Sequence, residues 1–140
     1  MAKYIFEVIE AAKSAKTKAE KIQILRSNES WALKDVLRGT LDKAIKWDLP
    51  EGTPPYTPND GHNSPSNLLK QNKQFKYFVY GTVSKQLPKY KRESIFIALL
   101  ESIHPKDAEL VVSMINKQKF GGGLTPNLVN EAFPDLVKSI

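Results

Sequence analysis

The segment KYKRESIFIALLESI, residues 89–103, carries the clearest secondary-structure pattern in the chain. Its apolar residues recur three and four positions apart, which is the spacing of one buried face of an α-helix. A break at residues 104–105 follows, and proline there fits the first turn of another helix, where N–H groups are unpaired. The predicted buried face consists of Ile95, Phe96, Leu99, Leu100 and Ile103.

Helical spacing of apolar residues recurs on both sides of this segment, and no stretch alternates with the two-residue period of a half-buried strand. The sequence also has no internal repeat and no βαβ rhythm. Its 140 residues suit one domain with a core of its own. We therefore predict an all-α fold, a single-domain bundle of about seven helices over residues 1–140. The other six helices are predicted over about 4–12, 17–26, 30–45, 65–79, 105–118 and 126–132.

Two of these helices carry expectations about individual residues. Thr17 is the expected N-cap of its helix, which places Ala19 toward the core. The helix that begins near Ser30 has an apolar stripe that includes Ala44 and continues as far as Ile45. Gly39 within this helix costs helix stability and therefore indicates close packing against another element.

The segment from residue 65 to residue 83 permits two interpretations. A helix is favoured, with Pro65 in its first turn and with Leu68 and Leu69 facing inward. Residues 77–83 are rich in β-branched and aromatic side chains, so a short strand there is the alternative.

Residues 50–65 are predicted to form a long proline-rich loop. The stretch contains five of the nine prolines and two glycines, and it has almost nothing to bury. Pro50 ends the helix before it. Neither flank is long enough for a separate domain, so the stretch is a loop and not a domain boundary.

Positive charge is concentrated in the middle of the chain. The protein has a formal net charge of +6, and residues 50–92 contribute +5. Residues 93–140 have a net charge of −2. From Ser66 to Arg92 there is no acidic residue at all, a pattern that favours a polyanion partner because lysine and arginine displace counterions from phosphates. The candidate phosphate contacts are Lys70, Lys73, Lys76, Lys85, Lys89, Lys91 and Arg92.

Aromatic residues lie between these bases, and two roles are open for them. Rings on a basic surface can stack on exposed bases or sugars. Large rings also supply much of a small core, and we expect core positions for most of them. The lysines, likewise, can form a solvated face instead of a binding surface. The rings are Phe75, Tyr77, Phe78, Tyr80 and Tyr90.

The sequence lacks the residues that several kinds of site require. With no cysteine, a disulfide scaffold, a thiolate metal site and a cysteine nucleophile are excluded. The two histidines, His62 and His104, provide little for a metal site or a catalytic triad. No apolar run approaches the roughly 18 residues of a membrane span. We expect a soluble, cytoplasmic, non-enzymatic protein with no cofactor, no metal and no membrane partner.

A run of three glycines, residues 121–123, precedes the last predicted helix, for which Thr125 is the expected N-cap. The lysine and hydroxyl of a Walker loop are missing after the final glycine. One interpretation is a phosphate site at exposed helix N–H groups. The other is a structural helix end followed by a flexible connector.

Five segments together resemble the N-terminal region of the ATP-dependent DNA ligases of T4-like bacteriophages. At the start these are FEVIEAA at 6–12, TKAEKIQIL at 17–25, LKDVLR at 33–38 and KWDLP at 46–50. At the other end, GLTPNLVNEAFPDL at 123–136 is similar to the closing helix of the same ligase domain. The likeness covers the whole chain in outline and the two ends in detail.

In that ligase family the region is an all-helical DNA-binding domain that grips the duplex around a nick. The resemblance implies DNA contacts by Gly121, Gly122, Gly123 and Thr125, with Lys117 and Lys119 beside them. The nucleotidyltransferase motif Lys-x-Asp-Gly is absent, because Pro58 stands where the adenylated lysine would be. The resemblance therefore implies a binding domain without its catalyst.

The leading hypothesis is a phage-encoded, non-catalytic DNA-binding protein that contacts the backbone of double-stranded or nicked DNA with weak base specificity. We expect salt-sensitive binding, and we expect charge reversal at Lys89, Lys91 and Arg92 to weaken it without lowering the melting temperature. The alternative is a protein–protein adaptor that binds a replication, repair, transcription or host factor through the proline-rich loop. A nucleotide-handling enzyme is a third and weaker possibility.

Overall fold

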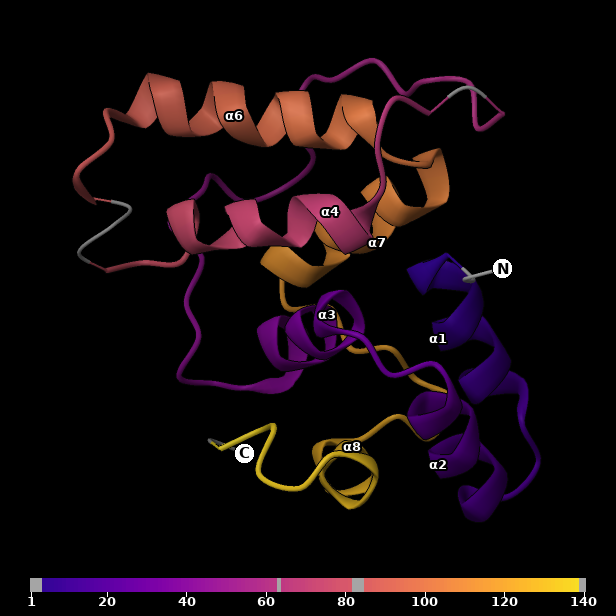
Figure 1. Cartoon of the computed structure of the whole chain (residues 1–140). Coiled ribbons are helices and arrows are strands. Elements are labelled where there is room, and N and C mark those ends of the chain that lie inside the picture. The colour runs from indigo at the N-terminus through magenta and orange to yellow at the C-terminus, as the bar shows by residue number, and fades with distance from the viewer. Residues whose placement is uncertain (1–3, 63, 82–84, 139–140) are drawn as a thin grey trace.

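The computed structural model describes residues 4–62, 64–81 and 85–138, which form a helical bundle (Figure 1). In this part of the chain the predicted all-α fold is confirmed. Extended pairing there is confined to one isolated antiparallel bridge between Trp47 and Val79. The elements are α1 (Ile5–Ser14), α2 (Lys18–Ser27), α3 (Trp31–Leu41), α4 (Leu68–Gln71), the 3-10 helix η1 (Asn72–Tyr77), α6 (Lys89–Ser102), α7 (Pro105–Ile115) and α8 (Pro126–Ala132).

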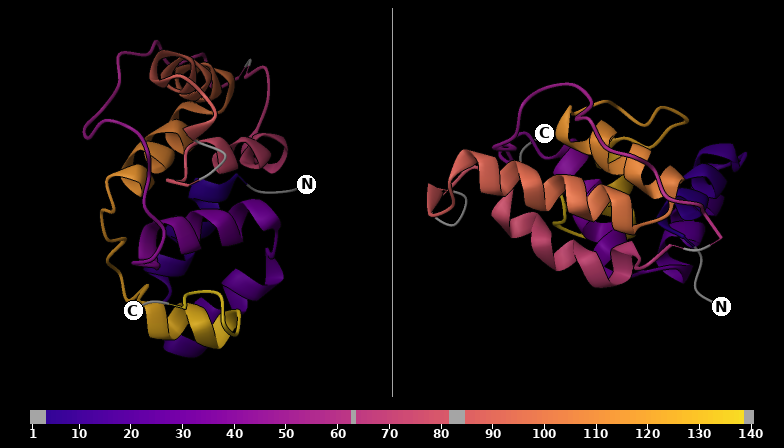
Figure 2. Two further views of the ribbon diagram at one scale, coloured as in Figure 1. Left: turned by 90° about the vertical axis from the view of Figure 1, so that its left-hand side faces the viewer. Right: turned by 90° about the horizontal axis from the view of Figure 1, so that it is seen from above.

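Helix α7 is the central helix of the bundle, since it packs against α1, α3 and α6. Above it in Figure 1 lies α6, and α4 with η1 runs roughly parallel to α6. Below lie α3 and α8, while α1 and α2 pack against each other at one side, as the turned views of Figure 2 also show. In Figure 1, α4 and η1 run toward the end of the molecule at which α6 starts, so the exposed bases of η1 and of the start of α6 lie toward that end.

Polar side chains fix where the helices begin. Thr17, Ser30, Asn67 and Thr125 each accept a hydrogen bond from the backbone N–H three residues ahead. His104 Nδ1 accepts from the N–H of the second residue of α7, at 3.0 Å. Such caps satisfy N–H groups that have no partner within the helix. The expected caps at residues 17 and 125 are confirmed.

The core forms from the predicted apolar faces. Phe96, Leu99, Leu100 and Ile103 are all buried, as the spacing of residues 89–103 indicates. Close packing at Gly39 is confirmed, because a Cβ built there would lie 2.6 Å from the ring of Trp47 and 2.8 Å from Met114 Sδ.

The helix predicted over residues 30–45 is wrong in its last turn. Helix α3 ends at Leu41, and Ala44, expected inside, is exposed. The side chain of Asp42 accepts a hydrogen bond from the Ala44 N–H at 2.9 Å, which holds the chain in a turn instead of a further helical turn. Ala19 is also exposed, against expectation. The buried residue of α2 is Leu25.

The segment from residue 65 contains part of the predicted helix and part of the alternative strand. Instead of one helix, α4 is a single turn that tightens into η1, and Leu69 is 43% exposed. Beyond η1, Val79 makes the bridge with Trp47, through hydrogen bonds from Asp48 N to Phe78 O and from Tyr80 N to Lys46 O. Residues 82–84 of the alternative strand lie outside the described residues.

Hydrogen bonds hold the proline-rich loop against the bundle at two places, near its start and near its end. The side chain of Asn116 exchanges hydrogen bonds with the N–H and C=O of Gly52, at 2.8 and 3.1 Å. Farther along, Asn59 Nδ2 donates to the carbonyls of Glu101 and Ile103 at the end of α6. The loop is therefore a strap across α6 and α7.

Candidate nucleic-acid interface

Lysines of α4 and η1 line up along one edge of the molecule. Lys70, Lys73 and Lys76 are all exposed and stand three residues apart. In a 3-10 helix, side chains three positions apart eclipse one another, so Lys73 and Lys76 of η1 project in the same direction. Exposed lysines at regular intervals along one segment suit contacts with the phosphates of a nucleic-acid backbone.

A groove lies beside this row, between η1 and α3. It has a volume of about 480 Å³, and we call it the η1 groove. Arg38 of α3 lies on one wall, about half exposed, at 3.5 Å from Asp35. The groove is lined by residues that include Arg38, Trp47, Lys73, Lys76 and Tyr80.

A second cavity, of about 740 Å³, lies between the end of α3 and the start of α8, and we call it the α3–α8 pocket. Leu41, Ile45, Ile115 and Leu124 supply apolar walls. Several residues that the ligase resemblance implied meet here, although the sequence placed them only near one another. The polar lining includes Lys43, Lys46, Lys117, Lys119, Gly121, Gly123 and Thr125.

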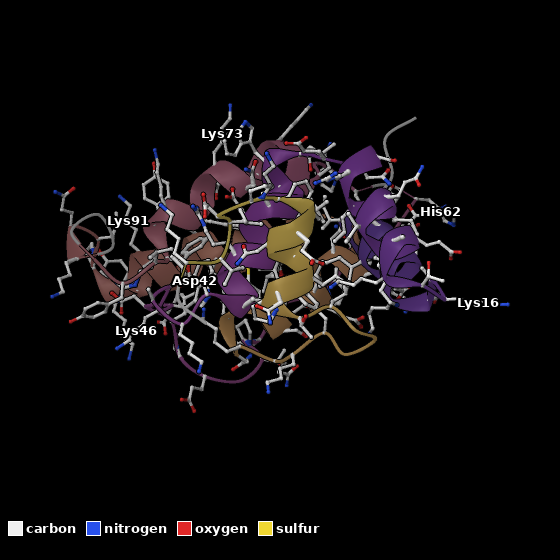
Figure 3. The ribbon with its side chains drawn as sticks, turned by 90° about the horizontal axis from the view of Figure 1, so that it is seen from below. Lys16, Asp42, Lys46, His62, Lys73 and Lys91 are labelled. Carbon is white, nitrogen blue, oxygen red and sulfur yellow. The ribbon has the colours of Figure 1, made fainter. Side chains whose placement is uncertain are left out.

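The two cavities are neighbours, because Ile45 and Trp47 line both. Together they form one surface, which we call the basic face. Figure 3 shows Lys46, Lys73 and Lys91 in the half of the molecule away from Lys16, with Lys73 and Lys46 at different edges of that view. The structure thus collects bases from segments that are far apart in the sequence.

The start of α6 extends this basic end of the molecule. Lys85, Lys89 and Lys91 are exposed, and Lys85 Nζ lies 4.6 Å from the centre of the Tyr80 ring. Tyr80 and Tyr90 are 56% and 73% exposed, so two of the five interleaved rings are on the surface. Of the others, Tyr77 is half-buried, while Phe75 and Phe78 belong to the core as expected.

Arg92 does not fit the predicted phosphate contact. Its side chain is buried, and its guanidinium donates to the carbonyl oxygens of Asp48 and Leu87 at 2.7 and 3.1 Å. It also lies 3.3 Å from Asp48 Oδ1. The burial of Arg92 argues against the expectation that charge reversal at this position leaves the melting temperature unchanged, because an ion pair and its hydrogen bonds would be lost.

Lys117 is likewise occupied within the fold. Its Nζ donates to the carbonyl oxygens of Gly39 and Asp42 at 2.6 and 2.8 Å, which caps the C-terminal end of α3. Burial lowers the pKa of this ammonium group, and the nearby carboxylate of Asp42 opposes that shift. Lys119, by contrast, is exposed.

The glycine run is not the helix end that its structural interpretation expected, because α7 ends at Ile115. All three glycines have positive φ, from 57 to 81°. A Cβ at Gly122 would lie 2.7 Å from that of Lys13, so the run packs closely against α1. The hydroxyl of Thr125 accepts from Leu128 N at 3.2 Å, and α8 has only seven residues.

A model of one protein family matches residues 8–119, which is most of the chain and includes every lysine of the two cavities. The chain belongs to DUF6433, a family of unknown function. The glycine run and α8 of this DUF6433 chain lie beyond the matched residues. Among curated proteins no match was found.

Three basic residues of the DUF6433 site were missed by sequence reasoning. Arg38, Lys43 and Lys46 all belong to the N-terminal part of the chain, whose charge is more balanced than that of residues 50–92. The sequence signal that could have revealed two of them is a short one: Lys43 and Lys46 lie on either side of the apolar Ile45, just before Trp47. Only the early end of α3 turns this stretch toward η1.

Metal and membrane sites receive no support from the described residues. No group of three or more His, Asp or Glu side chains in residues 4–62, 64–81 and 85–138 is placed to hold a metal ion. Over the same ranges, every helix is too short or too polar to cross a bilayer.

Proposed function

We propose that this DUF6433 protein is a non-catalytic DNA-binding protein that contacts the backbone of double-stranded or nicked DNA through the basic face. The observation that carries the proposal is the meeting of two cavities at Ile45 and Trp47, with exposed lysines on both sides. The resemblance to the DNA-binding domain of T4-like phage ligases supports the same function. It also favours phage origin and a role as a replication or repair accessory.

Phosphate contacts account for the affinity that this surface would provide. Four exposed lysines lie outside the α-helices. Lys73 and Lys76 are in the 3-10 helix η1, and Lys43 and Lys46 are in the irregular segment after α3, so together they can contact the phosphates of a bent or nicked strand. Lysine contacts to phosphate carry no base information, so sequence preference should be slight. The affinity should depend steeply on salt, because each neutralised phosphate releases a condensed counterion.

A second candidate is the protein–protein adaptor, and Trp31 is the observation that favours it. This side chain is 76% exposed on the first turn of α3, with Lys34 Nζ 5.0 Å from its ring. Tryptophan is enriched at the centres of protein interfaces. The strap 50–62 is less suited to docking than the sequence indicated, since its hydrogen bonds to α6 and α7 hold it in place.

The test is fluorescence anisotropy on labelled intact, nicked and single-stranded DNA over about 50–300 mM salt. Replacing Lys73 and Lys76 with glutamine should lower the slope of log affinity against log salt by about two units, one for each lost phosphate contact. A matched variant with glutamine at Lys16 and Lys18, at the opposite end, has the same net charge and should keep the slope. Absence of DNA binding at the lowest salt, or equal slopes in both variants, contradicts the proposal.

A further inference from the structure

We propose that the α3–α8 pocket holds one unpaired nucleotide, with the base in the apolar cavity and the phosphate at Lys43, Lys46 and Lys119. This inference rests on the proposed function and specifies its substrate as DNA with an unpaired nucleotide, for example at a flap. Free nucleotides share the same chemistry and are a separate arm of the test below.

The size and lining of the pocket suit a base. Its volume of about 740 Å³ falls within the range of roughly 300–1,000 Å³ that small-molecule sites occupy. Leu41, Ile45, Ile115 and Leu124 provide the apolar surface that a flat base would cover, and Trp47 contributes an indole ring. A base paired inside a duplex would first have to be extruded at a cost of a few kcal/mol, whereas an unpaired base avoids that cost.

An unsatisfied polar group lies in the lining. Thr40, on the last turn of α3, is 6% exposed, and its Oγ1 is buried without a hydrogen-bond partner among the described residues. Buried hydroxyls in proteins almost always have such a partner. A base edge carries donors and acceptors, so a small rotation of Thr40 would give this hydroxyl a partner in the occupied pocket.

The charge at the rim favours a phosphate. Lys43, Lys46 and Lys119 are all exposed around the pocket. The acidic member of the lining, Asp42, is occupied by the fold, since its carboxylate oxygens accept from the N–H groups of Ala44 and Lys138. The cationic rim is therefore opposed by a single carboxylate that already has two donors.

Continuity with the η1 groove favours a nucleotide of DNA over an unrelated apolar anion. Because Ile45 and Trp47 line both cavities, a strand held at Lys73 and Lys76 can reach the pocket without leaving the basic face. A fatty acid would need only one cation, whereas three exposed lysines surround this opening. Binding of decanoate is accordingly an outcome that the test must separate.

The first measurement uses Trp47 as a reporter. The protein has two tryptophans, so Trp31→Phe leaves Trp47 as the only one, and Trp31 is too exposed for this change to disturb the core. Emission is followed during titration with five probes: intact duplex, nicked duplex, nicked duplex with a one-nucleotide flap, deoxyadenosine monophosphate, and decanoate. The flap duplex should bind roughly fivefold or more tightly than the nicked duplex, as expected for one base stacked in an aromatic site, and should quench Trp47 most strongly.

Two variants locate the effect in the pocket, with affinities measured by anisotropy. Leu41→Trp fills the cavity and should abolish the preference for the flap duplex over the nicked duplex. Lys43→Gln with Lys46→Gln changes only exposed side chains, so folding is not at risk, and it should weaken flap binding more than Lys16→Gln with Lys18→Gln does.

The outcomes separate this inference from the proposed function. Equal affinity for nicked and flap duplexes overturns the pocket inference and leaves backbone binding standing. No binding to any DNA, with no response to the monophosphate, overturns both. Quenching by the monophosphate at concentrations where flap DNA has no effect identifies free nucleotide as the source. Quenching by decanoate in place of both overturns the nucleotide assignment.

Discussion

Asp107 is a carboxylate buried where α7 meets α1. It is 1% exposed, and its Oδ1 accepts the backbone N–H of Phe6 at 2.9 Å. Burial raises the pKa of this carboxyl to about 6, the Phe6 N–H opposes the shift, and nearby Glu7 adds to it. Since the folded-state pKa lies above the unfolded value of 3.8, the folded protein binds the proton more tightly. The stability that this group contributes is complete below pH 3.8 and is lost as pH rises through about 6.

Asp107→Asn should therefore remove a pH dependence and keep the acceptor for Phe6. We expect the variant to gain stability relative to the wild type between pH 4 and pH 7, by up to about 3 kcal/mol, because two pKa units correspond to about 2.7 kcal/mol. Urea unfolding at several pH values measures this difference. A difference that stays constant with pH would show that the carboxyl titrates normally in the folded protein.

At the scale of elements, basic side chains close the C-terminal ends of three helices. Lys21 Nζ donates to the carbonyls of Ala12, Lys13 and Ala15 at the end of α1, at 3.0, 3.0 and 2.8 Å. Arg26 does the same for α8, and Lys117 for α3. Cations satisfy the free carbonyls there and favour the negative end of the helix dipole. Part of the positive charge in this basic protein therefore serves the fold and not a ligand.

Replacing Lys21 with methionine should lower the free energy of unfolding by about 1–2 kcal/mol, since three carbonyls lose a charged donor. Lys18→Met is the matched control, because Lys18 makes an exposed ion pair with Glu131 and such pairs contribute about 0–1 kcal/mol. Thermal and urea melts of both variants measure the contrast. Equal losses would mean that the cap of α1 contributes no more than a surface ion pair.

At the scale of the whole molecule, Arg92 joins the segment after α3 to the start of α6. Its hydrogen bonds to Asp48 and Leu87 hold together two parts of the chain on which the basic face depends. Arg92→Gln should destabilise the protein by about 2–4 kcal/mol, because the buried guanidinium and its hydrogen bonds to Asp48 and Leu87 would be lost. Lys91→Gln, at an exposed neighbour, should leave the melting temperature nearly unchanged. Similar melting temperatures for the two variants would contradict this role.

Local signals allowed much of the fold to be predicted. Thr17 and Thr125 cap helices as their residue types indicate, and the spacing within residues 89–103 gives the buried face of α6. The end of α3 was missed, because it depends on Lys117, 75 residues away along the chain, and on a turn made by Asp42. Long-range hydrogen bonds of this kind leave no periodic pattern in the sequence.

The candidate site was predicted in part. The sequence indicated Lys73 and Lys76, and the resemblance added Lys119, all of which are exposed on the basic face. The sequence analysis also included Arg92 among the phosphate contacts, because charge patterning cannot distinguish a base that is buried against carbonyls from one in solvent. Lys46 was overlooked because its contribution arises only when Trp47 pairs with Val79.

That pairing also has a mechanical consequence. Two backbone hydrogen bonds, from Asp48 to Phe78 and from Tyr80 to Lys46, clamp the segment that carries the shared wall of both cavities. A rearrangement that slides this wall to widen one cavity must alter the other as well, because Ile45 and Trp47 cannot move for only one of them. The shapes of the two cavities are therefore coupled through Ile45 and Trp47.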